Sequence, residues 1–438
     1  VALALSVNNS SARLMLRDGS EIRIGPGAAN GTGKSLSGAL AAGDVVRLRA
    51  TGDSFVLAQI PKAQAALVSL QPEDGALRAV VGGFSYNTSG FNRATQAKRQ
   101  PGSSFKPFIY TAAFERGYSP SSVVLDAPVV FKDRKGNVWR PQNDKGGFKG
   151  PMRLREALVQ SRNLVSVRLL DGIGVNFARD YITRFGFAKE ALPPNLSMSL
   201  GTASLTPISV ARGYSVFANG GFLIEPYFIK SVTGPSGVMI GYSHPKRACG
   251  LCPERLAGDT SKAVVVDGFD LSDSGLAQDE LAKAGAGFDP SAPGPPGTAL
   301  APQTIDPRNA FLISDMMLDV VKRGTAVQAK VLERADIGGK TGSTNNHRDA
   351  WFVGFGGDLV TAVWVGKDDF KPLGSGEYGG RAALPIWIDY MRAALDGVPL
   401  KTMEPPAGIV KSTNGDFFKQ EQYDLEMQQV PPSENYEG

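Results

Sequence analysis

Strand-like segments lie toward both ends of the chain, and helical segments lie between them. Near the start, AALVSLQPEDGALRAVVGG (residues 65–83) has two apolar runs joined by Pro-Glu-Asp-Gly, which predicts a β-hairpin. Near the end, DAWFVGFGGDLVTAVWVG (residues 349–366) predicts two strands around a Gly-Gly-Asp turn. Residues 103–217 repeat apolar positions three and four apart, the spacing of amphipathic helices. We therefore predict an α+β domain whose sheet is built from both ends and packed against helices.

Further segments flank or interrupt this predicted domain, which we place at residues 63–400. Residues 1–62 contain short alternating runs separated by turn signals, as in ARLMLRDGSEIRIG, and predict a small barrel-like β module. Residues 243–307 include the aperiodic stretch GFDPSAPGPPGTALAPQ and predict a loop-rich insertion. Residues 401–438 end in a polar stretch and predict an extended tail.

Composition and charge exclude several classes of protein. No run of about 18 apolar residues occurs, so we predict no membrane-spanning helix. The chain starts VALALSVNNSSARLML, without Met or a signal peptide, and we expect a fragment whose anchor or targeting signal lies upstream. The net charge is +5, with Lys and Arg scattered among acids. This favours a mixed, solvated surface over a nucleic-acid-binding stripe, although weak attraction to a polyanionic matrix stays open.

Cysteine and glycine motifs give little support to metal, redox or phosphate chemistry. Cys249 and Cys252, in CGLC, lack the second Cys or His pair that a zinc site needs. Their loop-like surroundings favour a local disulfide or two inert thiols over a thioredoxin-like pair. GPGAANGTGKS resembles a phosphate-binding loop, but Ala28 stands where the pattern needs its first glycine.

Histidine is too scarce to activate a serine in the usual way. His244 and His347 are the two histidines of the sequence, and no Gly-x-Ser-x-Gly elbow occurs, so a triad of a serine with His347 and Asp349 is not favoured. A serine nucleophile therefore needs another base. Lysine can serve if burial and neighbouring positive charge lower its pKa toward neutrality.

The segment RQPGSSFKPF (residues 99–108) offers such a pair. Ser103 stands three residues before Lys106, and Ser104 stands two before it. Residues three apart share one face of a helix, so we predict Ser103 as the nucleophile and expect Ser104 to point elsewhere. Prolines on both sides place Ser103 at the helix start, where backbone N–H groups can stabilise an oxyanion.

Two more motifs supply partners for this pair. Ser-x-x-Lys is weak alone, because the chain also contains SHPK in a loop. SRN lies at the junction of two helical stretches, so Ser161 and Asn163 can face one cleft. KTGS (residues 340–343) holds the single Lys-Thr-Gly of the sequence and leads toward a strand. Gly342 would let an extended peptide approach that strand closely. In this order, the three motifs predict one active site.

The ordered set Ser-x-x-Lys, Ser-x-Asn and Lys-Thr-Gly resembles the penicillin-binding protein and serine β-lactamase family. The segments RQPGSSFKPFIYTAAFERG, ALVQSRNLVSVRLL, DIGGKTGSTNNHRDAWFVGF and GGRAALPIW narrow the resemblance to class A penicillin-binding proteins of the 1a type, over residues 63–398. It implies an antiparallel sheet flanked by helices, an all-helical subdomain and a preceding OB-like module. It also implies a membrane helix and a glycosyltransferase domain outside this chain.

The resemblance implies a catalytic role for five residues. Ser103 would attack the carbonyl of the penultimate D-Ala of a stem pentapeptide, with Lys106 as general base. Ser161 would carry the proton toward the leaving amine, and Lys340 would keep the local potential positive. Asn163 would hold both the substrate amide and Lys106. An amine from a neighbouring stem peptide would then attack the acyl-enzyme and form a cross-link.

The resemblance also implies how substrate is held and where the reaction takes place. The backbone N–H groups of Ser103 and Ser343 would form the oxyanion hole. The hydroxyl groups of Thr341 and Ser343, beside Gly342, would bind the carboxylate of the substrate or of a β-lactam. Ser343 replaces the family's usual Thr and keeps a hydroxyl. No metal or organic cofactor and no nucleic acid is expected. The implied location is the periplasmic face of a bacterial inner membrane, with stem peptides, β-lactams and wall-synthesis proteins as partners.

Other activities of the same pocket stay open. A class A β-lactamase would need a Glu-x-x-Leu-Asn stretch, and none occurs between Asn163 and Lys340. A D,D-carboxypeptidase differs mainly in using water as the acceptor. A β-lactam sensor would be acylated without processing peptide.

Overall fold

The computed structural model describes residues 1–132, 136, 138–144, 146–235, 237–249, 265–266, 269–270, 299–413 and 415–423. It divides the chain into two compact units, Val1–Lys62 and Ala63–Gly438, each with its own hydrophobic core. Much of the predicted insertion and the last part of the predicted tail lie outside the described residues. Within the described ranges, no helix is long and apolar enough to cross a bilayer.

The first unit is an antiparallel sheet with the strand order β3-β2-β1-β4-β5. Its strands are β1 (Ala2–Val7), β2 (Ala12–Leu16), β3 (Glu21–Ile24), β4 (Val45–Thr51) and β5 (Ser54–Ala58). The segments η1 (Pro26–Thr32) and α1 (Leu36–Ala39) connect β3 to β4 and add Ala28, Ala29 and Leu36 to the core. An OB-like fold stays a prediction for this unit.

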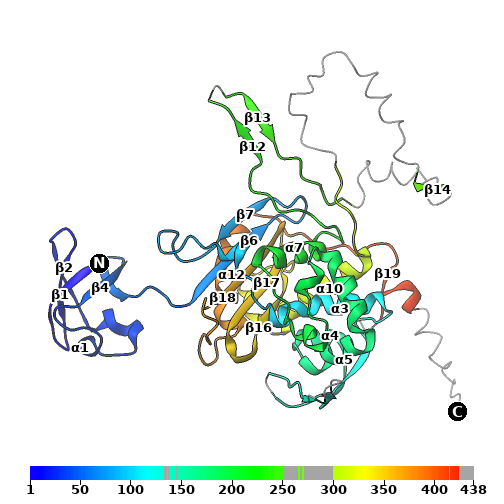
Figure 1. The fold of residues 1–438 in the computed structure, drawn as a ribbon, viewed down its shortest axis with the longest axis horizontal. Coiled ribbons are helices and arrows are strands. Elements are labelled where there is room, and N and C mark those ends of the chain that lie inside the picture. The colour runs from blue at the N-terminus through cyan, green and yellow to red at the C-terminus, as the bar shows by residue number, and fades with distance from the viewer. Residues whose placement is uncertain are drawn as a thin grey trace, which may run out of the picture. The chain divides into compact units, whose positions relative to one another are not determined.

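The second unit is built on an antiparallel sheet with the order β16-β17-β18-β6-β7 (Figure 1). The early strands are β6 (Gln64–Leu70) and β7 (Leu77–Val81), and the late strands are β16 (Gly338–Ser343), β17 (Asp349–Gly356) and β18 (Leu359–Gly366). β18 pairs with β6 from Val360 opposite Leu70 to Gly366 opposite Gln64. This pairing joins segments from both ends of the chain in one sheet, as the sequence predicts.

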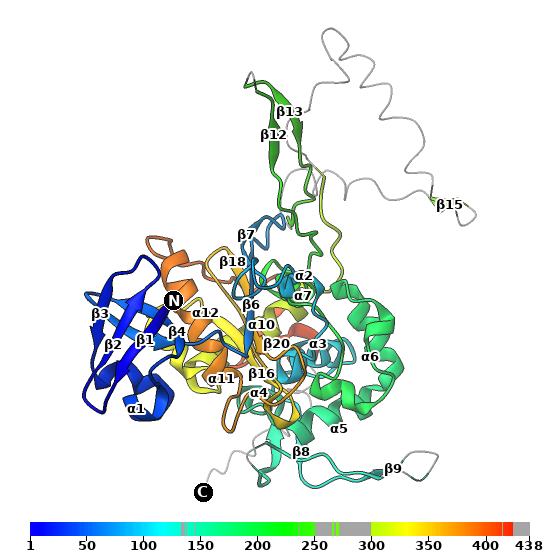
Figure 2. The same cartoon turned by 60° about the vertical axis from the view of Figure 1, so that its left-hand side comes forward.

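Helices cover both faces of this sheet (Figure 2). On one face lies α12 (Leu384–Ala394), and the rings of Trp387 and Phe352 in β17 meet edge to face with centroids 4.9 Å apart. The preceding residue, Trp351, points to the opposite face, where its Nε1 donates to Gln100 O at 2.8 Å. On that face lie α3 (Lys106–Glu115), α7 (Pro207–Ala218) and α10 (Pro307–Arg323). Because successive side chains of β17 point to opposite faces of the sheet, Trp351 can hold the backbone of the segment before α3.

A mainly helical region packs beside α3 and includes α4 (Leu154–Val159), α5 (Asn163–Ile173) and α6 (Val175–Ile182). The other helical segments are α2 (Arg93–Gln96), η2 (Gly102–Phe105), η3 (Thr183–Phe185), η4 (Lys189–Ala191), η5 (Leu196–Leu200), η6 (Val327–Leu332), η7 (Asn345–His347) and α11 (Gly379–Ala382). The other strands are β8 (Val123–Asp126), β9 (Phe131–Lys132), β10 (Val138–Trp139), β11 (Gly150–Arg153), β12 (Ser231–Thr233), β13 (Met239–Tyr242), β14 (Val265–Val266), β15 (Phe269–Asp270), β19 (Ile409–Lys411) and β20 (Phe417–Lys419).

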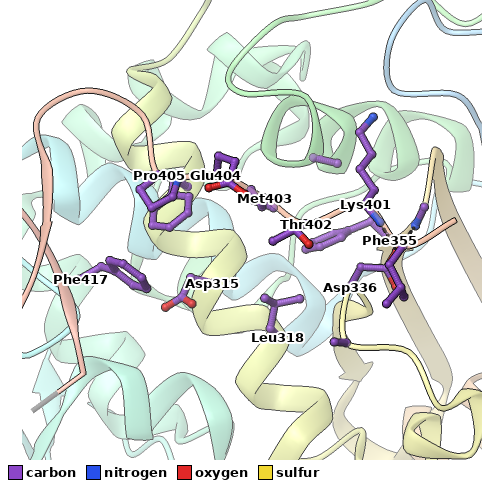
Figure 3. Close-up of a pocket in the computed structure, with 15 residues that line it drawn as sticks. Asp315, Leu318, Asp336, Phe355, Lys401, Thr402, Met403, Glu404, Pro405 and Phe417 are labelled. Carbon is purple, nitrogen blue, oxygen red and sulfur yellow. Dashed lines mark hydrogen bonds between the residues drawn. The ribbon is translucent and has the colours of Figure 1, made fainter.

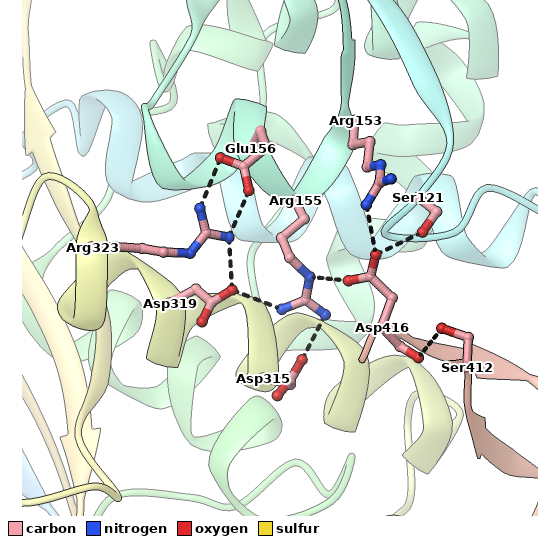
Figure 4. A network of polar contacts seen from close by, with 9 residues as sticks. All are labelled: Ser121, Arg153, Arg155, Glu156, Asp315, Asp319, Arg323, Ser412 and Asp416. Carbon is pink, nitrogen blue, oxygen red and sulfur yellow. Dashed lines mark hydrogen bonds and ion pairs between the residues drawn. The ribbon is translucent and has the colours of Figure 1, made fainter. Parts of the chain in front are cut away.

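The expectation of an extended tail over residues 401–438 is wrong for the hairpin of β19 and β20. Asp416, in this hairpin, accepts from Arg155 Nε of α4 at 2.7 Å (Figure 4). The Arg155 guanidinium also pairs with Asp315 and Asp319 of α10. A buried ion-pair network therefore connects the hairpin, α4 and α10. The polar sequence of this segment predicts that it is exposed. The prediction fails because the arginine that neutralises Asp416 lies 261 positions earlier in the chain.

A cavity of about 360 Å³ lies between α10, the end of β17 and the segment 400–405 (Figure 3). Phe311, Phe355 and Phe417 contribute aromatic walls, and Asp315 and Glu404 contribute carboxylates. None of the predicted site residues lines this cavity. The predicted active site therefore has to be sought elsewhere, around the start of α3.

Candidate active site

Ser103 lies in η2, a single 3₁₀ turn directly before α3. The predicted helix therefore opens with this turn, and its α-helical part begins at Lys106. Ser103 is 8% exposed, whereas Ser104 is fully buried. The Ser104 hydroxyl donates to Pro101 O at 2.7 Å, and Tyr214 OH donates to Ser104 O at 2.5 Å. Ser104 is thus held by the backbone of its own turn. Among the described residues, no hydrogen bond joins Ser103 Oγ to either lysine or to Ser161.

Lys106 is the first residue of α3 and is completely buried. Its Nζ donates to Ser161 O and to Asn163 Oδ1, both at 2.7 Å, and lies 3.3 Å from Ser161 Oγ. Burial lowers the pKa of Lys106 to about 7, although the negative charge of Asp144 opposes this effect. Near neutral pH a large fraction of this amine is therefore unprotonated and able to accept a proton.

Ser161 stands between α4 and α5 and connects the two lysines. Lys340 Nζ donates to Ser161 Oγ at 2.8 Å, so both lysines approach the same hydroxyl. Lys340 is fully buried, and burial together with the positive charge of Lys106 lowers its pKa well below the ordinary value. Ser161 has a φ of 57°, which costs a residue other than glycine roughly 1–3 kcal/mol. The fold therefore holds this serine in a strained conformation beside both amines.

The strand β16 forms an edge of the sheet and passes the nucleophile turn at backbone contact distance. A Cβ atom on Gly342 would lie 2.2 Å from Pro101 O. A Cβ atom on Gly102 would lie 2.3 Å from Ser343 O, and Gly102 has a φ of 56°. Gly102 is needed for both its φ and this close approach, and Gly342 for the close approach, so these two positions set the spacing between the two segments.

The hydroxyl groups of the KTGS segment are held by residues that sequence reasoning missed. Thr341 Oγ1 and Thr325 Oγ1 lie 2.7 Å apart, and Thr325 lies two residues beyond the end of α10. Ser343 Oγ accepts from the backbone N–H of Gly379, in α11, at 2.9 Å. The sequence carries no periodic signal for either contact, although Gly379 begins one of the segments that resemble the family.

A turn before β11 holds Asn163 and was also missed. Asn163 Nδ2 donates to Gln142 O and to Asp144 Oδ1, both at 2.9 Å. Asn143 Oδ1 accepts from the backbone N–H of Asn163 at 2.9 Å and so caps the N-terminus of α5. The local sequence PQND indicates only a turn. Its meeting with α5 depends on the tertiary fold.

The remaining candidates stand outside this group. No hydrogen bond connects His244 or His347 with the site residues in the described part of the chain. Cys249 is disulfide-bonded, which agrees with the first of the two alternatives for CGLC, and Cys252 lies outside the described residues. Across the described residues, no group of three or more His, Cys, Asp or Glu side chains could hold a metal ion.

The geometry supports serine acyl transfer. A serine at a helix start stands three residues before a buried lysine, this lysine and a second buried lysine share one further serine hydroxyl, and a glycine-containing edge strand passes the turn that carries the first serine. A buried amine of lowered pKa can activate a serine, and an open strand edge can take up an extended peptide. Together with the antiparallel sheet between helices, these features define the class that comprises penicillin-binding proteins and serine β-lactamases.

Comparison with known proteins identifies a domain of this class in the chain. Residues 65–248 match the penicillin-binding protein transpeptidase domain. The chain is 47% identical over 377 residues to Penicillin-binding protein 1A of Pseudomonas aeruginosa. The aligned residues make up 84% of this chain and 45% of that protein. It is 43% identical over 381 residues to Penicillin-binding protein 1A of Neisseria cinerea, covering 86% of this chain and 42% of that protein. The chain therefore contains a penicillin-binding protein transpeptidase domain.

Solved structures agree with this assignment. The crystal structure of Penicillin-Binding Protein 1A from Haemophilus influenzae matches with a TM-score of 0.82 and 36% identity, over 95% of this chain and 62% of that one. PonA1 from Mycobacterium tuberculosis, solved in complex with penicillin V, matches with a TM-score of 0.58 and 26% identity, over 80% of this chain and 82% of that one. The chain spans less than half the length of the curated relatives named above.

Proposed function

We propose that this chain is a peptidoglycan D,D-transpeptidase that cross-links stem peptides through an acyl-enzyme on Ser103 and is acylated by β-lactams. The observation that carries the proposal is the convergence of Lys106 and Lys340 on Ser161 Oγ, at 3.3 and 2.8 Å, next to the start of α3. Two buried amines of lowered pKa can pass a proton between nucleophile and leaving group without histidine.

Acylation begins with neutral Lys106. Its two N–H protons are directed to Ser161 O and Asn163 Oδ1, and we assign the remaining lone pair of Nζ to the Ser103 proton. Ser103 Oγ forms a bond to the carbonyl carbon of the penultimate D-Ala, and the carbonyl oxygen becomes an oxyanion. When the intermediate collapses, the C–N bond breaks. Lys106 returns the proton through Ser161 Oγ to the departing D-Ala amine, so the base is neutral again.

Binding groups on the edge strand orient the donor. We assign the backbone N–H groups of Ser103 and Ser343 to the oxyanion. The hydroxyl groups of Thr341 and Ser343 bind the terminal carboxylate, and their contacts with Thr325 and Gly379 support this role by fixing both side chains. Asn163 fixes Lys106 through Oδ1 and presents Nδ2 to the donor amide. No step requires a metal or an organic cofactor.

Deacylation repeats these steps with an amine as the nucleophile. The amine of a neighbouring stem peptide attacks the ester carbonyl and loses a proton to Lys106 by way of Ser161. The C–O bond to Ser103 breaks, and Ser103 Oγ regains the proton. The relatives named Penicillin-binding protein 1A favour this reaction over the carboxypeptidase and sensor alternatives. The substrate places the reaction at the extracytoplasmic side of a bacterial membrane.

Fluorescent penicillin tests the nucleophile. The wild-type chain, Ser103→Ala and the matched control Ser104→Ala are labelled and separated by gel electrophoresis. We expect label in the wild type and in Ser104→Ala, and none in Ser103→Ala. Label that survives in Ser103→Ala and vanishes in Ser104→Ala would contradict the assignment. Incubation with a pentapeptide donor and an amine acceptor, followed by mass spectrometry, then tests the reaction: a cross-linked product supports transpeptidation, and free tetrapeptide alone contradicts it.

A further inference from the structure

The carboxylate of Asp144 lies beside the side-chain amide of Asn163 and faces solvent. Asp144 is exposed, and its Oδ1 accepts from Asn163 Nδ2 at 2.9 Å. The other Nδ2 proton goes to Gln142 O at 2.9 Å, and Asn163 Oδ1 accepts from Lys106 Nζ. The hydrogen-bonding capacity of this amide is therefore used. Of its three partners, Asp144 is the one that contacts Asn163 through an exposed side chain, because Gln142 contributes its backbone oxygen and Lys106 is buried.

Asp144 differs in its surroundings from the other carboxylate that acts on Lys106. Asp126 is fully buried and pairs with Arg162 at 2.6 Å. Asp144 takes part in no ion pair among the described residues, and its one hydrogen-bond partner there is Asn163. A solvated, unpaired carboxylate at the rim of a site is free to pair with a charge that a ligand brings.

A charged group that an acyl donor carries next to its amide comes close to Asp144 when the donor binds. Under the proposed function, the donor's amide carbonyl accepts from Asn163 Nδ2. Gln142 O is backbone, whereas the Asp144 carboxylate is exposed and readily hydrated, so the carbonyl displaces Asp144. The carboxylate then lies next to the substituent on the carbon that follows the carbonyl. If the Asp144 carboxylate and a unit charge on that substituent are about 6 Å apart in water, their interaction changes the affinity for the donor roughly threefold. Reversing the sign of the substituent's charge then changes this affinity on the order of tenfold.

We propose that Asp144 is a specificity-determining residue that favours acyl donors with a cationic group next to the amide bound by Asn163 and disfavours donors with an anionic group there. This inference rests on the proposed acylation of Ser103 and specifies which donors that site prefers. The sequence contains no motif for it, since Asp144 reaches Asn163 only through the turn that caps α5.

Three penicillins test the inference, because they differ at the carbon next to the side-chain amide carbonyl. Ampicillin carries an ammonium group there, carbenicillin a carboxylate, and benzylpenicillin neither. Their acylation rate constants are measured in competition with fluorescent penicillin, at low ionic strength and at a pH at which the ampicillin amine is protonated. The proteins are the wild type, Asp144→Asn and the control Asp171→Asn. Asparagine keeps an acceptor for Asn163 Nδ2, and Asp171 is an exposed acid on α5, eight residues or about 12 Å beyond Asn163.

We expect the ratio of the ampicillin to the carbenicillin rate constant to fall on the order of tenfold in Asp144→Asn and to stay unchanged in Asp171→Asn. Added salt should reduce the ratio of the wild type and leave that of Asp144→Asn nearly constant. An unchanged ratio in Asp144→Asn, or an equal loss with all three penicillins, would overturn the inference and leave acylation of Ser103 intact. A wild-type chain that no penicillin acylates would overturn the proposed function itself.

Discussion

The lowered pKa of Lys106 predicts how the acylation rate depends on pH. If neutral Lys106 takes the Ser103 proton, the rate follows the unprotonated fraction of this amine. With a pKa of about 7, that fraction is about one-tenth at pH 6, one-half at pH 7 and nine-tenths at pH 8. The rate constant should therefore rise about fivefold from pH 6 to pH 7 and less than twofold from pH 7 to pH 8.

The assay is the second-order rate constant for labelling of Ser103 by fluorescent penicillin, measured at constant ionic strength. Melting temperatures at each pH provide the control. Because the pKa of Lys106 is lower in the folded than in the unfolded chain, the folded state binds fewer protons between about pH 7 and pH 10. The contribution of Lys106 to the stability of the folded chain therefore rises with pH between about pH 7 and pH 10 and is nearly constant below pH 7. A rate that is flat from pH 6 to pH 8, or that rises only above pH 9, would refute Lys106 as the neutral base.

Two further substitutions test how the site and its support are built. Gly102→Ala adds a Cβ atom 2.3 Å from Ser343 O at a φ of 56°, so we expect at least tenfold slower labelling and a lower melting temperature. Gly117→Ala, at a φ of 90° with no atom within 4 Å, should cost only about 1 kcal/mol and leave labelling unchanged. Arg155→Met leaves three carboxylates without their shared cation and should cost about 3–5 kcal/mol in urea unfolding. Arg392→Met, which breaks an exposed pair, should stay within about 0.5 kcal/mol, and equal losses for the two arginines would contradict the network.

The sequence by itself determined the elements whose signals are local. Alternating apolar residues around Pro-Glu-Asp-Gly predict β6 and β7, and Gly-Gly-Asp predicts the turn between β17 and β18. The choice of Ser103 over Ser104 also follows from local geometry, since a spacing of three places two side chains on one helical face. The Ser104 hydroxyl, bonded to Pro101 O, agrees with that argument.

The motifs were found in the sequence, but only the tertiary structure brings them together. Lys340 and Ser161 are 179 positions apart and meet at 2.8 Å. Lys106 and Asn163 are 57 positions apart and meet at 2.7 Å. No periodicity encodes such distances, and the resemblance to a known family was needed to connect these residues before the structure did.

Some features could be decided by the tertiary structure alone. Asp144 and Thr325 stand in no recognisable motif, and each is positioned by a partner at least 16 positions away. The hairpin that carries Asp416 looks like a polar tail in sequence, because its charges are neutralised by Arg155, 261 positions earlier. Burial of a charge depends on where its partner lies in space, and short-range patterns of polarity carry no record of that. The strained φ of Ser161 belongs here too, since only the packed junction of α4 and α5 imposes it.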